Sequence, residues 1–229
     1  MGYSMANGLD VSHSIMSPSA IMEEVMVKSS SADGMASVIR PGRRRSTNAD
    51  ELERAAFELF DQHGFDATTV EAIAAAVGIS KRTFFRYFGS KNDVVWGDFG
   101  KQLHVMRERF RDCPNDQPIM DAIRTVVVEF NRFDPAHVPW HRKRMELILG
   151  VPALQAHATL RYREWRYVVA EFVGRRLGLP AEELLPQSVA YAALGVAIAA
   201  YEHWLTWPSE PLTDVMDRSF RGLADGFIV

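Results

Sequence analysis

Two short apolar segments separated by one glycine constrain this chain more than any other feature. One face of residues 70–77 is apolar at helical spacing, and Gly78 can end that helix. Ser80 is a good N-cap for a second short helix. The small side chain of Ala74 lets the second helix approach the first, and Phe84 can lock the pair together. The spacing therefore predicts a helix-turn-helix unit.

A longer helix is expected to precede this unit. Apolar residues recur through residues 52–60 at the spacing of one helix face, and Gly64 can end the helix. Thr68 and Glu71 have the spacing of a capping box, so Thr68 is expected to cap the first short helix. These segments together predict an N-terminal domain of three helices.

The rest of the chain also has the pattern of helices. Ser90 is expected to cap a long helix that continues without a break through Phe110. Proline and glycine mark the joins between further expected helices at 117–132, 136–149, 153–177, 187–206 and 211–226. No β-hairpin signal occurs. The sequence predicts an all-α protein, with a helix-turn-helix domain over residues 40–91 and a larger helical ligand-binding and dimerisation domain over residues 92–229.

Composition narrows the class of protein further. The chain has 229 residues, of which 47% are hydrophobic, so it can bury a sizeable core. Its single cysteine, Cys113, excludes a disulfide framework and any multi-cysteine zinc site. The longest uninterrupted apolar run, residues 189–201, is shorter than the roughly 18 residues of a membrane-spanning helix. A cytoplasmic protein without a membrane partner is expected.

The N-terminal segment carries little structural signal. Residues 1–39 lack a sustained hydrophobic period and are expected to form a disordered tail, with Met35 as an alternative start. No basic stretch precedes an apolar core there, so a signal peptide is not expected.

Basic residues gather at two places, although the net charge is −3. Arg40, Arg43, Arg44 and Arg45 lie just before the first helix, and basic, hydroxyl and aromatic groups alternate along residues 80–88. In a helix-turn-helix unit the second helix enters the major groove, and its N-terminus also favours phosphate. Phe84 and Phe88 are expected in the core. These residue types predict binding to double-stranded DNA.

Residues 46–95 resemble the DNA-binding domain of the TetR family of bacterial transcription regulators. The matching stretches are Ala55–Phe60, Gly64-Phe65, Thr68–Ala74, Val77–Ser80, Thr83–Phe88 and Ser90-Lys91. The resemblance implies a ligand-responsive repressor that binds a palindromic operator as a dimer. Residues 96–99, 141–145 and 201–205 are further similar to a subgroup of the family associated with mycofactocin, a peptide-derived redox cofactor.

The resemblance also implies how the operator is contacted. Residues 81–83 would face bases, Arg82 could read guanine, and Tyr87 and Lys91 would hold phosphates. Phe85 stands where many members have tyrosine, so contact with a thymine methyl group would replace a hydroxyl contact. The basic arm before the first helix could reach the minor groove. The full expected set is Arg43, Arg44, Arg45, Thr68, Thr69, Ser80, Lys81, Arg82, Thr83, Phe85, Arg86, Tyr87 and Lys91.

The larger domain has a stripe of aromatic and aliphatic residues, which is either ordinary core or the wall of an effector cavity. The basic run Arg142–Arg144 is either a solvated face or a dock for phosphate or carboxylate. The second interpretation would suit a fatty acyl-CoA. The expected effector residues are Trp96, Phe99, Leu103, Phe130, Trp140, Arg142, Arg144, Met145, Ile148 and Trp165.

Residues 189–200 are apolar nearly all round and must be covered on all sides. The resemblance implies that the last two helices form the interface of a homodimer. The alternative function is a small all-α lipid carrier or enzyme without specific DNA binding. We find no nucleophile–base pair and no Gly-rich phosphate loop, so no catalytic residue or cofactor is expected. His137 and His141 are four residues apart, but Pro139 disturbs the helix start, and no metal site is expected.

Overall fold

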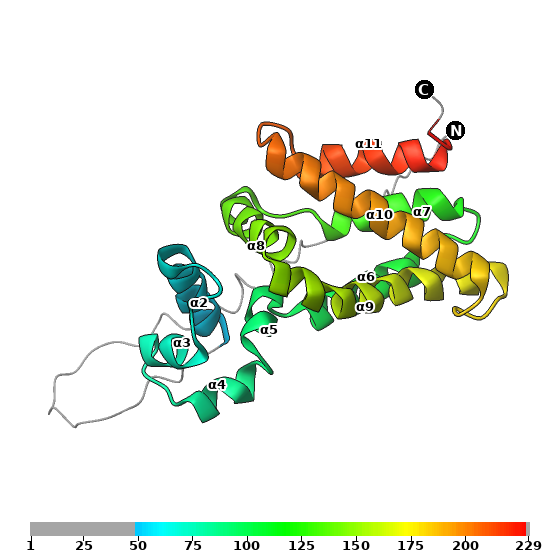
Figure 1. The fold of residues 1–229 in the computed structure, drawn as a ribbon. Coiled ribbons are helices and arrows are strands. Elements are labelled where there is room, and N and C mark those ends of the chain that lie inside the picture. The colour runs from blue at the N-terminus through cyan, green and yellow to red at the C-terminus, as the bar shows by residue number, and fades with distance from the viewer. Residues whose placement is uncertain (1–48, 228–229) are drawn as a thin grey trace, which may run out of the picture. The chain divides into compact units, whose positions relative to one another are not determined.

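Helices joined by loops and turns make up the part of the chain that the structure describes. The computed structural model describes residues 49–227, so the expected tail over residues 1–39 and the arm residues Arg40, Arg43, Arg44 and Arg45 lie outside it. No strand occurs within residues 49–227, which confirms the all-α prediction (Figure 1). The helices are α2 (Ala49–His63), α3 (Val70–Ala76), α4 (Lys81–Tyr87), α5 (Lys91–Trp96), α6 (Phe99–Asp112), α7 (Ile119–Phe130), the 3-10 helix η1 (Pro135–His137), α8 (Val138–Gly150), α9 (Pro152–Leu177), α10 (Leu184–Thr206) and α11 (Leu212–Ala224).

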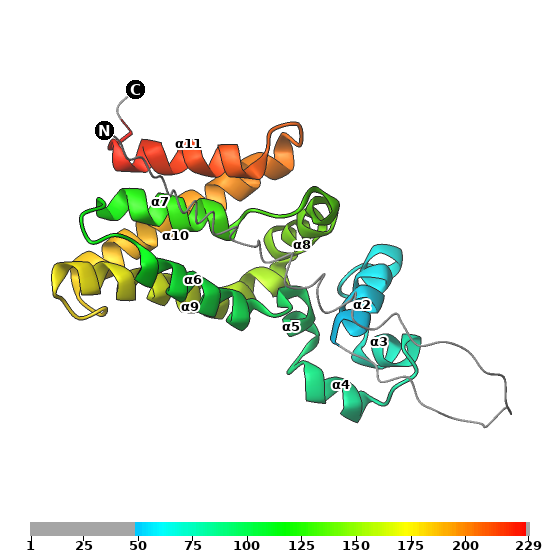
Figure 2. The same ribbon diagram turned by 180° about the vertical axis from the view of Figure 1, so that it is seen from behind.

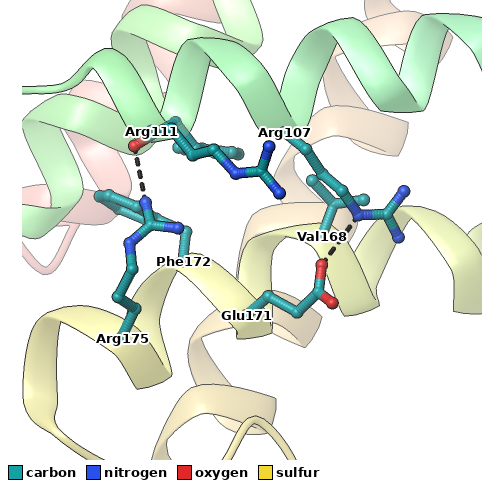
Figure 3. A pocket seen from close by; sticks show the side chains of 7 residues that line it. Arg107, Arg111, Val168, Glu171, Phe172 and Arg175 are labelled. Carbon is teal, nitrogen blue, oxygen red and sulfur yellow. Dashed lines mark hydrogen bonds and ion pairs between the residues drawn. The ribbon is translucent and has the colours of Figure 1, made fainter.

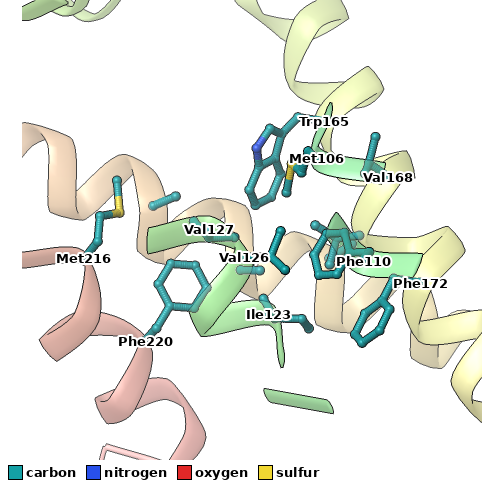
Figure 4. Packing of buried hydrophobic residues seen from close by; sticks show 14 of the residues in the cluster. Met106, Phe110, Ile123, Val126, Val127, Trp165, Val168, Phe172, Met216 and Phe220 are labelled. Carbon is teal, nitrogen blue, oxygen red and sulfur yellow. The ribbon is translucent and has the colours of Figure 1, made fainter. Parts of the chain in front are cut away.

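The buried side chains form two clusters. The smaller cluster joins α2–α5 and also contains Met145, Ile148 and Leu154 from α8 and α9. The larger cluster is built from α6, α7, α9, α10 and α11, and Figure 4 shows how their side chains interlock. Tyr201 and Leu205 contact both clusters. In both ribbon views α8 lies between α2–α4 and α10 (Figures 1 and 2).

The helix-turn-helix unit forms where the sequence predicts it. Gly64 and Gly78 follow α2 and α3 with φ angles of 80° and 71°, a conformation that glycine adopts without strain. The expected capping box is wrong by one residue. Thr69, not Thr68, is the N-cap of α3, and its hydroxyl oxygen accepts a hydrogen bond from the N–H of Ala72 at 3.1 Å.

The expected long helix after Ser90 is broken at Gly97. Ser90 caps α5 as expected, but α5 ends at Trp96 and α6 begins at Phe99. Gly97 has a φ angle of 53°, and a Cβ there would lie 2.7 Å from Oε2 of Glu53 and 2.9 Å from Nη1 of Arg144. The apolar period continues across the break, and the pair Gly97-Asp98 is the local sign of it, with glycine at the end of one helix and aspartate before the next.

The remaining helices agree with the expected ranges to within a few residues. The main difference is α10, which begins at Leu184 and includes Pro186 in its first turn, where a proline needs no hydrogen-bond partner for its nitrogen. By length and composition alone α10 could cross a membrane, with a mean hydropathy of 1.5 over 18 residues. It packs against α9 and α11, yet only 28% of that window is buried in one copy of the chain.

Candidate nucleic-acid interface and effector site

The helix α4 has a buried face and an exposed face. Phe84 is fully buried and Phe88 nearly so, which confirms that both belong to the core. Ser80 accepts a hydrogen bond from the N–H of Thr83 at 3.2 Å, so the first turn is fixed. Phe85 leaves 45% of its surface exposed. The other exposed side chains of the helix are Lys81, Arg82, Arg86 and Tyr87. The fold thus brings the expected base-reading residues to one surface.

Lys81 has a partner within the helix-turn-helix unit. Its Nζ donates to Oε1 of Glu71 at 2.5 Å, and this hydrogen bond lowers the pKa of the Glu71 carboxyl group. Both side chains are more than half exposed. Exposed ion pairs contribute little to stability, so the Lys81 ammonium group can exchange this partner for a base or a phosphate.

The two threonines before α3 have different environments. Thr68 is buried, and its hydroxyl group donates toward the carbonyls of Gly64 at 2.8 Å and Leu59 at 3.2 Å. A hydroxyl contact from Thr68 to DNA is therefore not available in this arrangement. Thr69 is exposed beside the first turn of α3.

Lys91 is held against the loop that follows α2. Its Nζ donates to the carbonyl oxygens of Phe65 at 2.6 Å and Thr68 at 2.9 Å, and it lies 4.2 Å from the centre of the Phe65 ring. Desolvation lowers the pKa of its ammonium group. Lys91 therefore ties α5 to the start of the helix-turn-helix unit, with a weaker contact to the Asp66 carbonyl at 3.5 Å.

The expected effector residues do not form one wall. Trp96, Met145 and Ile148 are buried in the smaller cluster, which Trp140 also contacts. Leu103 and Trp165 are buried in the larger cluster, which Phe130 also contacts, and Phe99 touches both. The indole nitrogen of Trp96 is buried and has no hydrogen-bond partner within residues 49–227. The Trp96 ring packs against Phe99, so this buried donor lies beside a residue that touches both clusters.

The basic run on α8 is bound to protein groups. Arg142 donates to the carbonyls of Trp204 at 3.0 Å and Leu205 at 3.3 Å near the end of α10, and its guanidinium lies 4.0 Å from the Trp204 ring centre. Lys143 forms an ion pair with Asp61 of α2. The run is thus neither an open dock nor a solvated face, because it connects α8 to its neighbours.

Arg144 is more buried than Lys143. It forms an ion pair with Glu53 of α2 and donates to the carbonyl of Trp96 at 3.4 Å. The indole N–H of Trp140 donates to the same Glu53 carboxylate at 3.2 Å. Burial raises the pKa of Glu53, while the Arg144 guanidinium opposes that rise.

Glu53 is not among the residues expected from the sequence, although its position on α2 carries one signal. Glu53 lies one helical turn before Ala56 and Phe57, on the apolar face of α2. A carboxylate on such a face requires a partner.

A buried polar network joins α7, α8 and α10. The Tyr201 hydroxyl lies 2.9 Å from Nε2 of His141 and donates to the side-chain oxygen of Asn131. Burial lowers the pKa of His141 to about 3, so the imidazole is neutral. His137 is exposed in η1, and no cluster of three possible metal ligands occurs within residues 49–227.

Two family models match the chain. The model described as "Bacterial regulatory proteins, tetR family" matches residues 53–95, and the model described as "MftR C-terminal domain" matches residues 117–228. Over 181 residues, the chain is 44% identical to the mycofactocin biosynthesis transcriptional regulator MftR of Mycobacterium tuberculosis, covering 79% of this chain and 91% of MftR. It is 29% identical to the HTH-type transcriptional regulator TcmR of Streptomyces glaucescens, covering 62% of this chain and 65% of TcmR.

Solved structures share the fold at lower identity. Thermus thermophilus FadR, a transcriptional repressor in complex with lauroyl-CoA, aligns with a TM-score of 0.53 and 21% identity, covering 80% of this chain and 96% of FadR. The fatty acid degradation regulator FadR of Bacillus halodurans aligns with a TM-score of 0.57 and 17% identity, covering 78% and 99% of the two chains.

Proposed function

Because the chain belongs to the TetR family of transcription regulators, we propose that it is a repressor that binds a palindromic operator as a homodimer and leaves it when an apolar effector binds. The single observation that carries the proposal is the two-faced helix α4. Phe84 anchors the helix in the core, while Arg82, Phe85 and Arg86 face outward. A helix held in this way can enter a major groove with its side chains already positioned.

The dimer is proposed to form through α10 and α11. The window of α10 that is apolar enough for a membrane is mostly unburied in one copy, and Tyr191 and Leu185 each expose more than half of their surface. A second copy would remove this apolar surface from water. A dimer would also present two recognition helices to half-sites about 34 Å apart. The membrane is then not the partner, and the proposed location is the cytoplasm.

The effector is proposed to be a fatty acyl-CoA that binds at the junction of the two clusters. The rings of Phe99 and Tyr162 pack beside the indole of Trp96 there. The indole N–H, which has no partner within residues 49–227, could donate to a carbonyl oxygen of the ligand. The lauroyl-CoA complex of Thermus thermophilus FadR supports the ligand class through the shared fold. The 44% identity to MftR supports a role in controlling mycofactocin biosynthesis.

The signal is proposed to pass through Gly97 and α8. Arg142 holds α8 to the end of α10, while Lys143 and Arg144 hold α8 to α2. A ligand that moves α6 or α8 would therefore strain the helix-turn-helix unit directly. Release of DNA requires the ligand to prefer the non-binding arrangement, because equal affinity for both states shifts nothing.

A gel shift with the promoter region of the chain's own gene, followed by footprinting, tests DNA binding. The preformed complex is then titrated with acyl-CoAs of increasing chain length and with the matching free acids. Release that strengthens with chain length supports the effector class. If no acyl-CoA displaces DNA, the effector proposal fails and the repressor proposal stands.

The alternative of an enzyme or a lipid carrier has no support from the family, which consists of transcription regulators. Specific retention of the promoter fragment separates the two functions, since a carrier would bind lipid but no particular duplex.

A further inference from the structure

A groove between α6 and α9 is lined by none of the residues expected to contact DNA or effector. Its volume is about 200 Å³. Figure 3 shows three guanidinium groups around it, those of Arg107 and Arg111 from α6 and that of Arg175 from α9. Phe110, Val168 and Phe172, all buried, supply the apolar part of its wall. The groove thus combines a cationic rim with an apolar base.

The arginines of the rim keep hydrogen-bond donors for a ligand. Arg107 donates through Nε to Glu171 at 2.9 Å, and Arg175 donates through Nη2 to the carbonyl of Phe110 at 2.8 Å. Arg111 pairs with Glu108 on its own helix. Each guanidinium carries five N–H donors. The contacts of the three arginines, which are those seen within residues 49–227, use only some of these donors. The remaining N–H groups can bind an added acceptor.

The rim also keeps an excess of positive charge. Glu171 and Glu108 pair with two of the arginines, whereas Arg175 binds a neutral carbonyl. An anion entering the α6–α9 groove would therefore meet uncompensated charge.

We propose that this groove is an anion-binding site for a diphosphate or bisphosphate group. A guanidinium group is planar and can donate two parallel N–H hydrogen bonds to two oxygens of one phosphate group. A single carboxylate offers two oxygens, whereas a diphosphate offers enough to reach arginines on both helices at once. Free inorganic pyrophosphate and the nucleotide head of coenzyme A both supply this chemistry. The inference goes beyond the proposed function and does not depend on which effector binds at the cluster junction.

The test measures binding of inorganic pyrophosphate to the full chain by calorimetry, without divalent cations. We expect saturable binding that weakens about tenfold in Arg111→Gln, which corresponds to the loss of charge-assisted hydrogen bonds. Arg132→Gln is a matched control. Arg132, like Arg111, is more than half exposed and pairs with a glutamate three residues earlier, but it does not line the groove. Its pyrophosphate affinity should stay within about twofold of wild type.

Equal weakening in both variants, or the absence of saturable binding to wild type, overturns the proposal. Competition by coenzyme A would identify the nucleotide head as the source of the anion, and binding without competition would identify the free anion. Arg111→Gln should leave operator binding unchanged in the absence of ligand. The anion-site proposal can therefore fail while the repressor proposal stands. The repressor proposal can likewise fail while the anion-site proposal stands.

Discussion

The carboxylate of Glu53 and the guanidinium of Arg144 meet beside Gly97, where α5 ends and α6 begins. Glu53 belongs to the first described helix of the DNA-binding unit, and Arg144 lies 91 residues later in the chain. Their ion pair occupies the space that any larger residue at position 97 would need. The break between α5 and α6 and the contact between α2 and α8 are therefore one structural feature.

Replacement of Gly97 by alanine should destabilise the protein by about 1–3 kcal/mol. The left-handed backbone conformation disfavours an L-residue, and the new Cβ would displace the buried ion pair. Urea unfolding measures the loss. Gly100→Ala is the control, because Gly100 lies within α6 and a Cβ there meets no atom within 4 Å. That change should be neutral or stabilise by about 0.5–1 kcal/mol, and equal losses at both positions would contradict the argument.

Replacement of Arg144 by methionine should cost about 3–5 kcal/mol at pH 7, because it leaves Glu53 buried without its charged partner. The pKa of Glu53 is already raised in the folded state, so the folded protein binds this proton more readily than the unfolded chain does. The free energy of unfolding therefore falls as pH rises from about 4.5, the ordinary pKa, through the higher pKa of the folded state.

Removing the guanidinium should raise the folded pKa of Glu53 further. The pH range over which stability falls should then extend toward neutral pH. Urea unfolding of the variant at pH 5 and pH 7 should then show the larger loss at pH 7. The double variant Glu53→Gln/Arg144→Met should recover much of the stability. A loss independent of pH would show that the charge of Glu53 is not its cause.

The buried imidazole of His141 should make the protein less stable in acid. Its folded pKa of about 3 lies below the ordinary value of 6.5, so the unfolded state binds the proton more readily. This contribution to stability is complete above about pH 6.5 and declines as pH falls toward 3. His141→Gln should unfold more easily at pH 7 but show a flatter decline between pH 6.5 and pH 4.5. If the stability of the variant and of wild type declined in parallel with falling pH, His141 would be excluded as the source of the acid sensitivity.

Replacement of Arg82 by alanine should cost about 1–3 kcal/mol of operator binding and relax specificity at one base pair. Arg82 lies on the exposed face of α4, where a guanidinium can pair with guanine. Fluorescence anisotropy with operators substituted one base pair at a time measures the effect. Uniform weakening across all these operators would assign Arg82 a purely electrostatic role.

Replacement of Lys91 by alanine should lower both stability and operator affinity. The loss of the hydrogen bonds to the carbonyls of Phe65 and Thr68 should cost about 1–3 kcal/mol of unfolding free energy. If Lys91 also contacts a phosphate, the slope of log affinity against log salt should decrease by about one. Lower stability with an unchanged salt slope would show that Lys91 only positions the loop and does not contact a phosphate.

The sequence predicts features that depend on neighbouring residues. The caps at Ser80 and Ser90, the inward position of Phe84 and the turn at Gly78 each follow from a few residues of local pattern. The pair Gly97-Asp98 is a local sign of the break between α5 and α6, but the side chains of α2 and α8 that fill the space beside Gly97 cannot be predicted from neighbouring residues.

The partners of the basic run on α8 cannot be predicted from the sequence for a similar reason. A charged residue has the same sequence signature whether it faces water, a ligand or a distant carboxylate. Only the fold shows that Arg142 reaches the end of α10 and that Lys143 reaches Asp61. The spacing to Glu71 predicts Thr68 as the cap of α3, whereas in the structure the Thr68 hydroxyl group points back to the carbonyl of Gly64.

The smaller cluster has a consequence for engineering hybrid regulators. Met145, Ile148 and Leu154 complete the core around α2–α5, although they lie far along the chain. A fragment cut at Trp96 would expose the apolar surface that these side chains cover, and it would aggregate or unfold rather than bind an operator on its own. The operator specificity of this protein is thus not a detachable module, and a graft onto another ligand-binding half would need the matching face of α8 as part of the transplant.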